Sequence, residues 1–449
     1  MKMLDGVNKI SLYGAGKSNA ALSALLKRSG WQGELTLRSD RAVTREEYEN
    51  IRPDILLCGK AASENFHEDI AFISPSVKTD VIPKKEGLRI CTDVELFFEE
   101  RERRAIGITG SDGKSTTTYL ISEILRASGI DASPLGNFGT PFSSFFDSNI
   151  FAVAELSSFQ LTHYTPKLLR AVITNVTENH LDWHGSMKEY VRAKLSIFAR
   201  AEKIVYDADS EILKANLPER RAFCITSSEL PLKELQNSFN SENFLTLEGT
   251  EMLLNGEHYI DVSGAKRREE YNIKNYMLAA AATLGLVTKD AVLQTILNFK
   301  GLKHRSELLF SENGIDYIDS SVDSSPERSA RTLDALRGDI VAITGGRGKG
   351  LSLAPLCDAL LRKCKGAVVL GEVGDALLSG VAKDERFASF RIRKATDMKD
   401  AVAIAKNMLG GSGTVILTPA ATSFDKYKNF EERAADFENA CRALSKKEI

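Results

Sequence analysis

Short runs of apolar, often β-branched residues alternate along the whole chain with longer amphipathic stretches. Such alternation is typical of parallel α/β sheets, because two parallel strands need a long crossover and a helix usually provides it. Breaks in the pattern near residues 100 and 300 predict blocks at 1–100, 101–299 and 300–449. At roughly 100–200 residues per domain, 449 residues leave room for three. We therefore expect an α/β protein of three domains.

The first block opens with the strand-like run Lys9–Tyr13, the glycine turn Gly14–Ser18 and an amphipathic helix. Glycines at such a turn let the backbone approach a phosphate at the N-terminus of the helix. Tight turns between packed strands and helices also use glycine. This segment alone therefore leaves nucleotide binding and a plain turn equally open.

A stronger signal is Gly110–Thr117, which follows the buried-strand run Ala105–Thr109 and precedes a helix reaching to about Gly129. A phosphate-binding loop needs glycines so that N–H groups wrap the phosphates, a lysine for their outer oxygens, and a Ser or Thr for magnesium. Gly113-Lys114-Ser115 supplies that end of the motif, although Ile108 stands where the strict motif has its first glycine. A glycine turn with a surface lysine would not explain the whole pattern, so we predict phosphate binding.

Two polar residues follow the next predicted strands, Glu155 after 151–154 and His180 after 171–174. Open α/β sheets bind ligands at the carboxyl ends of their strands, and Mg²⁺ prefers oxygen ligands. A solvated glutamate and a structural histidine are the alternatives. We favour a magnesium ligand for Glu155 and a functional role for His180. Lys194 lies on a predicted helix, 186–200, where nothing local distinguishes it from a surface lysine.

Composition excludes several classes of function. The 59 Lys and Arg residues nearly balance the 61 Asp and Glu residues, which argues against binding to nucleic acid or to an anionic membrane surface. The six cysteines are scattered without a C-x-x-C pair, as in a reducing compartment. No apolar run approaches the roughly 18–20 residues of a membrane span, and the N-terminus does not read as a signal peptide. We expect a cytoplasmic protein and a monomer.

Taken together, these residues resemble the Mur ligase family. The resemblance covers nearly the whole chain, and these segments carry it: Gly110–Thr117, Leu135–Gly139, Glu155–Leu161, Thr174–Asp182, Ala193–Lys194, Leu302–Arg305 and Thr418–Asp425. The pieces Glu155–Leu161 and Ser423–Phe430 are similar to the branch that adds D-glutamate more than to its sister ligases.

The resemblance implies a Rossmann-like N-terminal domain that binds a UDP-sugar, residues 1–100. It also implies a central P-loop ATPase domain with a mostly parallel sheet, residues 101–299, and a Rossmann-like C-terminal domain for the amino acid, residues 300–449. The implied enzyme is an ATP-dependent ligase of peptidoglycan precursor synthesis. It would activate the alanyl carboxylate of UDP-N-acetylmuramoyl-L-alanine as an acyl phosphate and join it to D-glutamate, with two Mg²⁺ ions and a carbamylated lysine.

The resemblance also assigns residues. Lys114, His180 and Lys194 would be catalytic. The set for ATP would be Gly110, Ser111, Asp112, Gly113, Lys114, Ser115, Thr116, Asn272, Asn275, Arg305 and Asp319. Magnesium would be held by Ser115, Glu155, His180 and Lys194 as its carbamate, the UDP-sugar by Gly14, Gly16, Ser18 and Asn137, and D-glutamate by Lys349, Ser423 and Phe430.

The chain departs from the family pattern at two places. Ser321 stands where many members have a lysine, and Gly348 where many have an aspartate. The carboxylate of D-glutamate would then need another partner, for which Ser324, Ser325 and Arg328 are the alternatives.

Two other functions stay open at this point. One is a related amide ligase that adds another amino acid, or a folylpolyglutamate-type enzyme, which would differ mainly at Lys349, Ser423 and 320–325. The other is a non-catalytic nucleotide-binding switch, which would leave Glu155, His180 and Lys194 without a role.

Overall fold

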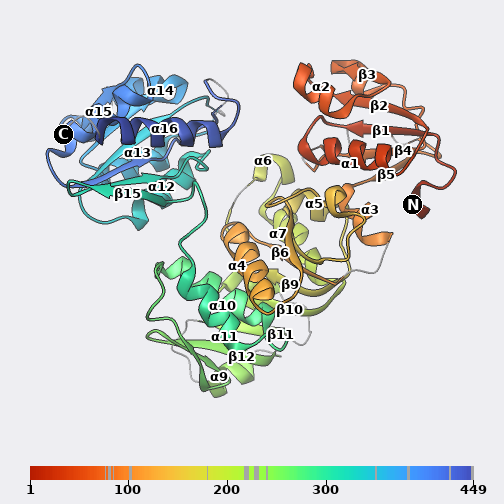
Figure 1. The fold of residues 1–449 in the computed structure, drawn as a ribbon, viewed down its shortest axis with the longest axis horizontal. Helices are drawn as coiled ribbons and strands as arrows, with labels where there is room; N and C mark the ends of the chain where they lie inside the picture. Colours follow the sequence, from red (N-terminus) through yellow and green to blue (C-terminus); the bar gives the residue numbers. More distant parts are fainter. Residues whose placement is uncertain are drawn as a thin grey trace. The chain divides into compact units, whose positions relative to one another are not determined.

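The computed structural model describes residues 1–75, 77–78, 82–83, 85–100, 104–178, 180–216, 222–226, 232–238, 241–348, 351–381, 385–423 and 426–445 (Figure 1). The chain divides into two compact units, Met1–Phe299 and Lys300–Ile449. Among the described residues, the first unit contains sheets of five and nine strands and the second a sheet of six. Every described helix is too short or too polar to cross a bilayer.

The N-terminal sheet is parallel throughout. In spatial order its strands are β3 (Ile55–Cys58), β2 (Glu34–Ser39), β1 (Lys9–Tyr13), β4 (Ile70–Ile73) and β5 (Arg89–Cys91). The order reverses between β1 and β4, and such a switch point is where open α/β sheets bind ligands. The glycine turn 14–16 leaves β1 at this point.

Helices α1 (Lys17–Arg28), α2 (Arg45–Ile51) and α3 (Asp93–Glu99) contribute apolar side chains to one core of this sheet. Thr44 and Glu47 form a reciprocal capping box that fixes the start of α2. The short helices η1 (Lys2–Leu4) and η2 (Gly59–Ser63) complete this part of the chain.

The central sheet is mostly parallel, and its last two strands in chain order are added by antiparallel pairing. In spatial order it runs β14 (Glu257–Asp261), β13 (Glu251–Leu254), β12 (Ser241–Glu248), β11 (Ala222–Thr226), β10 (Ala201–Asp207), β9 (Leu168–Ile173), β6 (Ala105–Thr109), β8 (Phe151–Glu155) and β7 (Ala132–Gly136). The antiparallel strands occupy the polar region 231–264, whose lack of an apolar period gave no strand prediction.

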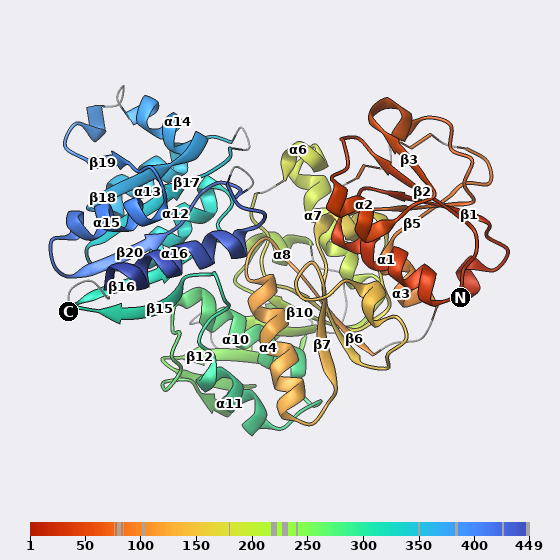
Figure 2. The same cartoon turned by 45° about the horizontal axis from the view of Figure 1, so that its top comes forward.

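Helices of the central sheet carry much of the candidate site. Helices α4 (Lys114–Ala127) and α10 (Glu270–Thr283) lie side by side against it (Figure 2), followed by α11 (Lys289–Asn298). The opposite core includes residues of α5 (Ser158–His163), α7 (Met187–Leu195) and η5 (Ser196–Phe198). The remaining short helices are η4 (Phe142–Phe145), α6 (Leu181–His184), α8 (Glu211–Asn216) and α9 (Leu232–Ser238).

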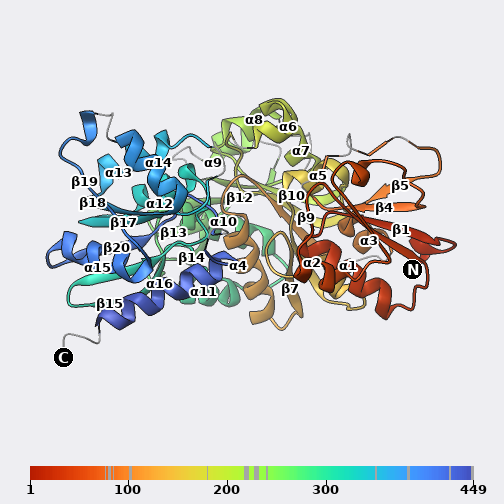
Figure 3. The same ribbon diagram turned by 90° about the horizontal axis from the view of Figure 1, so that it is seen from above.

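The second unit is built on one sheet with helices on both faces (Figure 3). The strand order is β15 (Glu307–Glu312), β16 (Ile315–Asp319), β20 (Gly413–Leu417), β17 (Ile340–Gly345), β18 (Gly366–Leu370) and β19 (Arg391–Lys394), and only β15 is antiparallel to its neighbour. Helices α12 (Pro326–Ala335), α13 (Ala354–Lys363) and α14 (Gly371–Val381) pack on one face. Helices α15 (Met398–Leu409) and α16 (Phe430–Ser445) pack on the other, and η6 (Glu385–Phe387) precedes β19.

Candidate active site

The loop between β6 and α4 has the shape that a phosphate-binding loop requires. Gly110 and Gly113 have φ values of +148° and +78°, which side-chain-bearing residues rarely adopt. A Cβ on Gly110 would lie 1.8 Å from Thr174 Oγ1, and one on Gly113 would lie 2.4 Å from Asn275 Oδ1. Glycine is therefore needed at both positions for conformation and for space.

Residues that follow β9 hold this loop in place. The backbone N–H of Ser111 donates to the carbonyl of Asn175 at 2.9 Å, and that of Asp112 donates to Asn175 Oδ1 at 2.9 Å. The Ser111 hydroxyl lies 2.9 Å from the hydroxyl of Tyr190 on α7. These contacts fix the loop from two directions before any ligand binds.

Lys114 and Lys194 converge on one backbone oxygen. Lys114 Nζ donates to the carbonyls of Gly110 at 2.8 Å and Ser111 at 3.0 Å, and Lys194 Nζ donates to the same Gly110 carbonyl at 2.6 Å. Lys194 comes from α7, 84 residues further along the chain, and its side chain is only 2% exposed. Two lysine side chains thus lie together beside the loop.

The surroundings of Lys194 disfavour its charged form. Burial first, and then the nearby charge of Lys114, lower the pKa of Lys194 well below its usual value, while Asp112 and Glu155 oppose this change. The nitrogen also lies 4.6 Å from the centre of the Tyr190 ring. A lowered pKa increases the fraction of the neutral amine, which can act as a nucleophile, whereas an ammonium cannot.

Glu155, the last residue of β8, is 1% exposed. Its Oε1 accepts a hydrogen bond from Asn137 Nδ2 at 2.9 Å. Within the described part of the chain, its buried Oε2 has no hydrogen-bond partner. A buried carboxylate oxygen without a partner is costly unless a ligand completes it, and a divalent cation can do so.

His180 precedes α6 and has a left-handed backbone, with φ of +55°. Its ring lies edge-on to Phe159, with centroids 5.0 Å apart, and 6.4 Å from the ring of Tyr190. Strained backbone of this kind persists where surrounding contacts impose it, often at binding sites. Because its ring lies near Tyr190, which contacts Ser111, His180 lies close to the loop, although its side chain is exposed.

Helix α10 carries two residues predicted to contact the nucleotide, and it brings one of them, Asn275, to the loop. Asn275 Oδ1 accepts a hydrogen bond from Thr117 Oγ1 at 3.2 Å, and Asn272 Nδ2 donates to Glu269 Oε2 at 2.9 Å. Both asparagines are about 5% exposed or less. Ser115 and Thr116 lie in the first turn of α4, directly after the loop.

The turn after β1 shows a similar close approach of backbone. Gly14 has φ of +97°, and a Cβ there would lie 2.6 Å from Ser74 Oγ, beyond β4. Asn19 Nδ2 joins the two segments by donating to the Gly14 carbonyl at 2.7 Å and to Ser74 Oγ at 3.2 Å. Gly16 precedes α1 and Ser18 lies in its first turn, so three of the four predicted UDP-sugar residues lie at the switch point of this sheet, and the fourth, Asn137, lies beside Glu155.

The other predicted site residues belong to the second unit. Arg305 lies between α11 and β15, and Asp319 ends β16 and is fully buried. Ser423 is buried after β20, and Phe430 begins α16. Lys349 lies outside the described residues.

Comparisons with known proteins agree with this geometry. The Mur ligase middle domain model matches residues 108–283. A UDP-N-acetylmuramoylalanine–D-glutamate ligase of Acetivibrio thermocellus is 30% identical, over 97% of this chain and 96% of that protein. The same-named ligase of Clostridium botulinum strain 657 is 30% identical over 97% of both chains. The chain belongs to the Mur ligase family.

Solved structures support the fold. The chain resembles the MurC ligase of Thermotoga maritima with a TM-score of 0.63 and 17% identity, over 97% of this chain and 99% of that one. The MurF ligase of the same organism, solved with ADP, gives 0.53 and 14%, over 94% and 92%. These structures confirm the predicted α/β fold class, and the 30% identical ligases confirm the predicted enzyme class.

The sequence did not predict the roles of some residues of this site. Asn175 and Tyr190 hold the loop, and Asn137 holds Glu155, although it was predicted only as a sugar contact. Asn175 directly follows a predicted strand. The preference of open α/β sheets for ligands at the carboxyl ends of strands, which indicated Glu155, therefore also applies to Asn175. Tyr190 carries no local signal.

Proposed function

We propose that the chain joins D-glutamate to UDP-N-acetylmuramoyl-L-alanine, converting ATP to ADP and phosphate. The observation that carries the proposal is the convergence of Lys114 and Lys194 on the Gly110 carbonyl, in a chain whose relatives bear the name of that ligase. Amide formation from a free carboxylate is uphill in water. The carboxylate therefore first needs a better leaving group, which the γ-phosphoryl group of ATP supplies.

The chain's own residues would reduce the repulsion between two anions. The alanyl carboxylate attacks the γ-phosphorus, so an oxygen–phosphorus bond forms and the bond to ADP breaks. Lys114 leaves the Gly110 and Ser111 carbonyls to contact phosphate oxygens, and the N–H groups of the loop wrap the same phosphates. The result is an acyl phosphate whose carbon an amine can attack.

The residues present fit magnesium. Glu155 Oε2 is buried and lacks a partner among the described residues, and Ser115 offers a hydroxyl at the start of α4. We propose that these two, with His180 and a modified Lys194, hold two Mg²⁺ ions. When bound, the ions neutralise charge on the phosphates.

We also propose that Lys194 carries a carbamate. The neutral form of its amine would form a nitrogen–carbon bond to CO₂ and release one proton, which turns the neutral group into an anion. The support is its burial, its lowered pKa and the adjacent Lys114, whose charge would then attract and no longer repel. A carbamate oxygen would also be a suitable ligand for Mg²⁺.

Each predicted domain would bind a different substrate. Residues 1–100 would bind the UDP-sugar, 101–299 ATP, and 300–449 D-glutamate through Lys349, Ser423 and Phe430. Arg305 would contact phosphate. We further propose that the protein works in the cytoplasm as a monomer.

A phosphate-release assay with different amines tests the function. With ATP, Mg²⁺ and UDP-N-acetylmuramoyl-L-alanine, we expect D-glutamate to stimulate release and L-glutamate, L-alanine and diaminopimelate to give little. Mass spectrometry of the product should show the UDP-sugar heavier by one dehydrated glutamate. Stimulation by another amino acid, with the corresponding product mass, would instead identify a sister ligase.

The hydrogen bond from Asn137 to Glu155 makes a separate prediction. In Asn137→Ala the Glu155 carboxylate loses the donor that orients it. Loss of such a support typically weakens metal binding by about 10–100-fold, so the Mg²⁺ concentration for half-maximal activity should rise by about that factor. A Mg²⁺ titration measures it, with Asn298→Ala, on the exposed end of α11, as the matched control. An unchanged Mg²⁺ requirement would contradict the proposed metal role of Glu155.

A further inference from the structure

A segment of the N-terminal sheet reaches the helices of the central sheet. It begins at Ser74, which follows β4 at the switch point and lies close to Gly14. A Cβ on Gly14 would also lie 3.9 Å from Val77 Cγ2, and the Val77 N–H donates to the Ser74 carbonyl at 3.0 Å. Lys78 follows directly, and its Nζ lies 5.8 Å from the centre of the Trp183 ring on α6. This segment therefore links the glycine turn after β1 to helices of the central sheet.

The surroundings of the Trp183 ring are aromatic. Its centroid lies 4.8 Å from that of Phe159, and the Phe159 centroid lies 5.0 Å from that of His180. The ring of His163, at the end of α5, lies 6.2 Å from Trp183. Burial lowers the pKa of His163, although a hydrogen bond to the Val77 backbone opposes this change, so its imidazole is mostly neutral at neutral pH. The ammonium group of Lys78 thus lies beside aromatic and neutral groups.

Lys78 has no anionic partner in the part of the chain that the structure describes. Its Nζ forms no hydrogen bond or ion pair with a described residue, and its side chain is half-buried. The face of a tryptophan ring attracts an ammonium group, but it offers no lone pair to the three N–H donors of that group. An oxyanion would supply such lone pairs, so the surroundings of Lys78 favour an anionic ligand.

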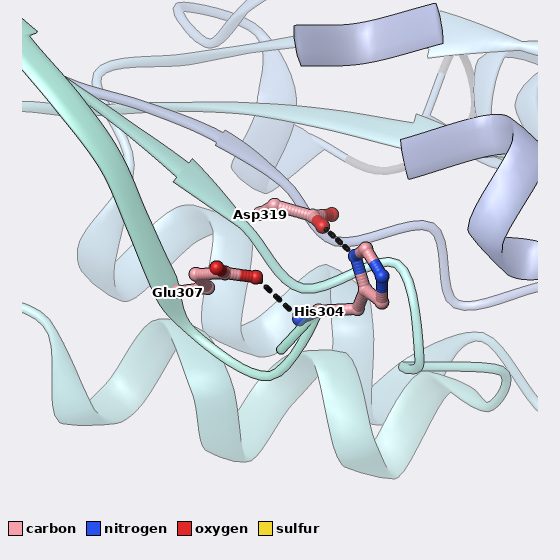
Figure 4. Close-up of side chains that lie close together, drawn as sticks. All are labelled: His304, Glu307 and Asp319. Atoms are coloured by element: carbon pink, nitrogen blue, oxygen red, sulfur yellow. Dashed lines mark hydrogen bonds and ion pairs between the residues drawn. The ribbon is translucent and has the colours of Figure 1, made fainter. Parts of the chain in front are cut away.

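A charged cluster of the second unit differs in this respect. His304 Nδ1 lies 2.7 Å from Asp319 Oδ2, and the His304 N–H donates to Glu307 Oε2 at 2.7 Å (Figure 4). Ligand atoms of these three residues lie within 4.8 Å of one another, but the imidazole and the backbone N–H already contact both carboxylates. The cluster therefore gives no indication of a ligand comparable to that given by Lys78.

The position of Lys78 indicates which anion it meets. Open α/β sheets bind ligands at a switch point, and the N-terminus of α1 at this point favours phosphate groups. In the other direction, the ring of His180 lies near Tyr190, which contacts Ser111 of the phosphate-binding loop. A UDP-sugar that binds at the switch point and reacts at the loop would therefore pass the segment that carries Lys78.

We propose that Lys78 binds an oxyanion of the UDP-sugar, and that the Trp183 ring holds the ammonium group in position for it. The inference rests on the proposed function. UDP-N-acetylmuramoyl-L-alanine carries two kinds of oxyanion, the diphosphate and the alanyl carboxylate, and both accept the same charge-assisted hydrogen bonds from an ammonium group. Either contact would make Lys78 a binding residue for this substrate, in addition to the residues of the glycine turn.

Lys78→Met removes the charge and keeps most of the length of the side chain. In calorimetric titrations with Mg²⁺ and a non-hydrolysable ATP analogue present, the Kd for UDP-N-acetylmuramoyl-L-alanine should rise about 10–100-fold, as expected for the loss of a hydrogen bond to a charged group. Lys78→Arg keeps the charge and should bind nearly as the parent does. Lys60→Met, at an exposed lysine on η2 of the same domain, is the matched control and should bind as the parent does.

Two further ligands identify the oxyanion. UDP carries the diphosphate without the sugar or the carboxylate, and the alaninamide of the substrate lacks only the charge of the carboxylate. If Lys78 binds the diphosphate, Lys78→Met should weaken the binding of UDP and of the substrate by the same factor. If Lys78 binds the carboxylate, UDP should bind equally to parent and variant, and the alaninamide should do so too.

Trp183→Leu and Trp183→Phe test the positioning role. Leucine has no aromatic face, so Trp183→Leu should weaken substrate binding, whereas phenylalanine keeps such a face and should restore much of the affinity. In the Lys78→Met background, Trp183→Leu should cause little further loss, because groups that act together are not additive. Equal losses in both backgrounds would show that Trp183 supports the local structure and does not position Lys78.

Unchanged affinity of the Lys78→Met protein for the substrate would overturn the inference. So would equal weakening of the substrate and its alaninamide with UDP unaffected, because Lys78 would then act on an uncharged part of the sugar. Loss of ATP binding together with UDP-sugar binding would make Lys78 a structural residue. All three results leave the proposed function intact, which fails separately if the parent protein binds no UDP-N-acetylmuramoyl-L-alanine.

Discussion

Replacement of Lys114 by alanine should lower turnover by at least about 100-fold, because one strong stabiliser of developing charge typically contributes about 3 kcal/mol to the transition state. The structure gives the reason: Lys114 Nζ donates to the carbonyls of Gly110 and Ser111, so this cation lies within the loop that would hold the phosphates. The loss should appear mainly in kcat, since the charge matters most when two anions react.

The measurement is steady-state phosphate release with all three substrates saturating. Lys399→Ala, an exposed lysine on α15, is the matched control and should keep the parent rate. Circular dichroism should show the parent fold in both variants. Near-normal turnover of a folded Lys114→Ala protein would rule out the role of this loop in phosphoryl transfer.

Lys194→Ala should be nearly inactive, and short carboxylic acids such as acetate or propionate should restore part of the activity. The substitution removes the buried amine and leaves space lined by Gly110 and Tyr190. If the working group is a carbamate, a small carboxylate can occupy that space and supply the missing anion. If the working group is an ammonium, a carboxylate has the wrong charge and cannot help.

Lys114→Ala is the control for this rescue. Lys114→Ala should not respond to the same acids, because there the missing charge is positive. Rescue should saturate with acid concentration and should weaken as the acid grows too large for the space. A folded Lys194→Ala protein that no carboxylic acid activates would count against the carbamate, while leaving the amide ligase function to the product assay.

The phosphate-binding loop could be predicted from sequence because its determinants are contiguous. The glycines at 110 and 113, the lysine at 114 and the strand and helix around them lie within one short segment. Glu155 could be predicted because a parallel sheet brings strand ends to one edge, so position along the chain implies position in space. For these parts of the site, the local sequence indicates where the residues lie in the fold.

The rest depends on contacts between distant residues. Lys194 meets Gly110 across 84 residues, and its own helix gives no sign that it is buried. Likewise, the strands β12–β14 are half-polar and pair mainly through their backbones, so no apolar period marked them. The pairing of His304 with Asp319 follows from the antiparallel alignment of β15 with β16, which sequence alone did not predict.

The bond between Asn137 and Glu155 links two equilibria. If Asn137 contacts the UDP-sugar and also orients Glu155 as a Mg²⁺ ligand, binding of either ligand changes the affinity of the protein for the other. Thermodynamic reciprocity requires the factor to be the same in both directions. The Mg²⁺ concentration would therefore change the affinity for the UDP-sugar, and a sugar that does not engage Asn137 would change the requirement for Mg²⁺.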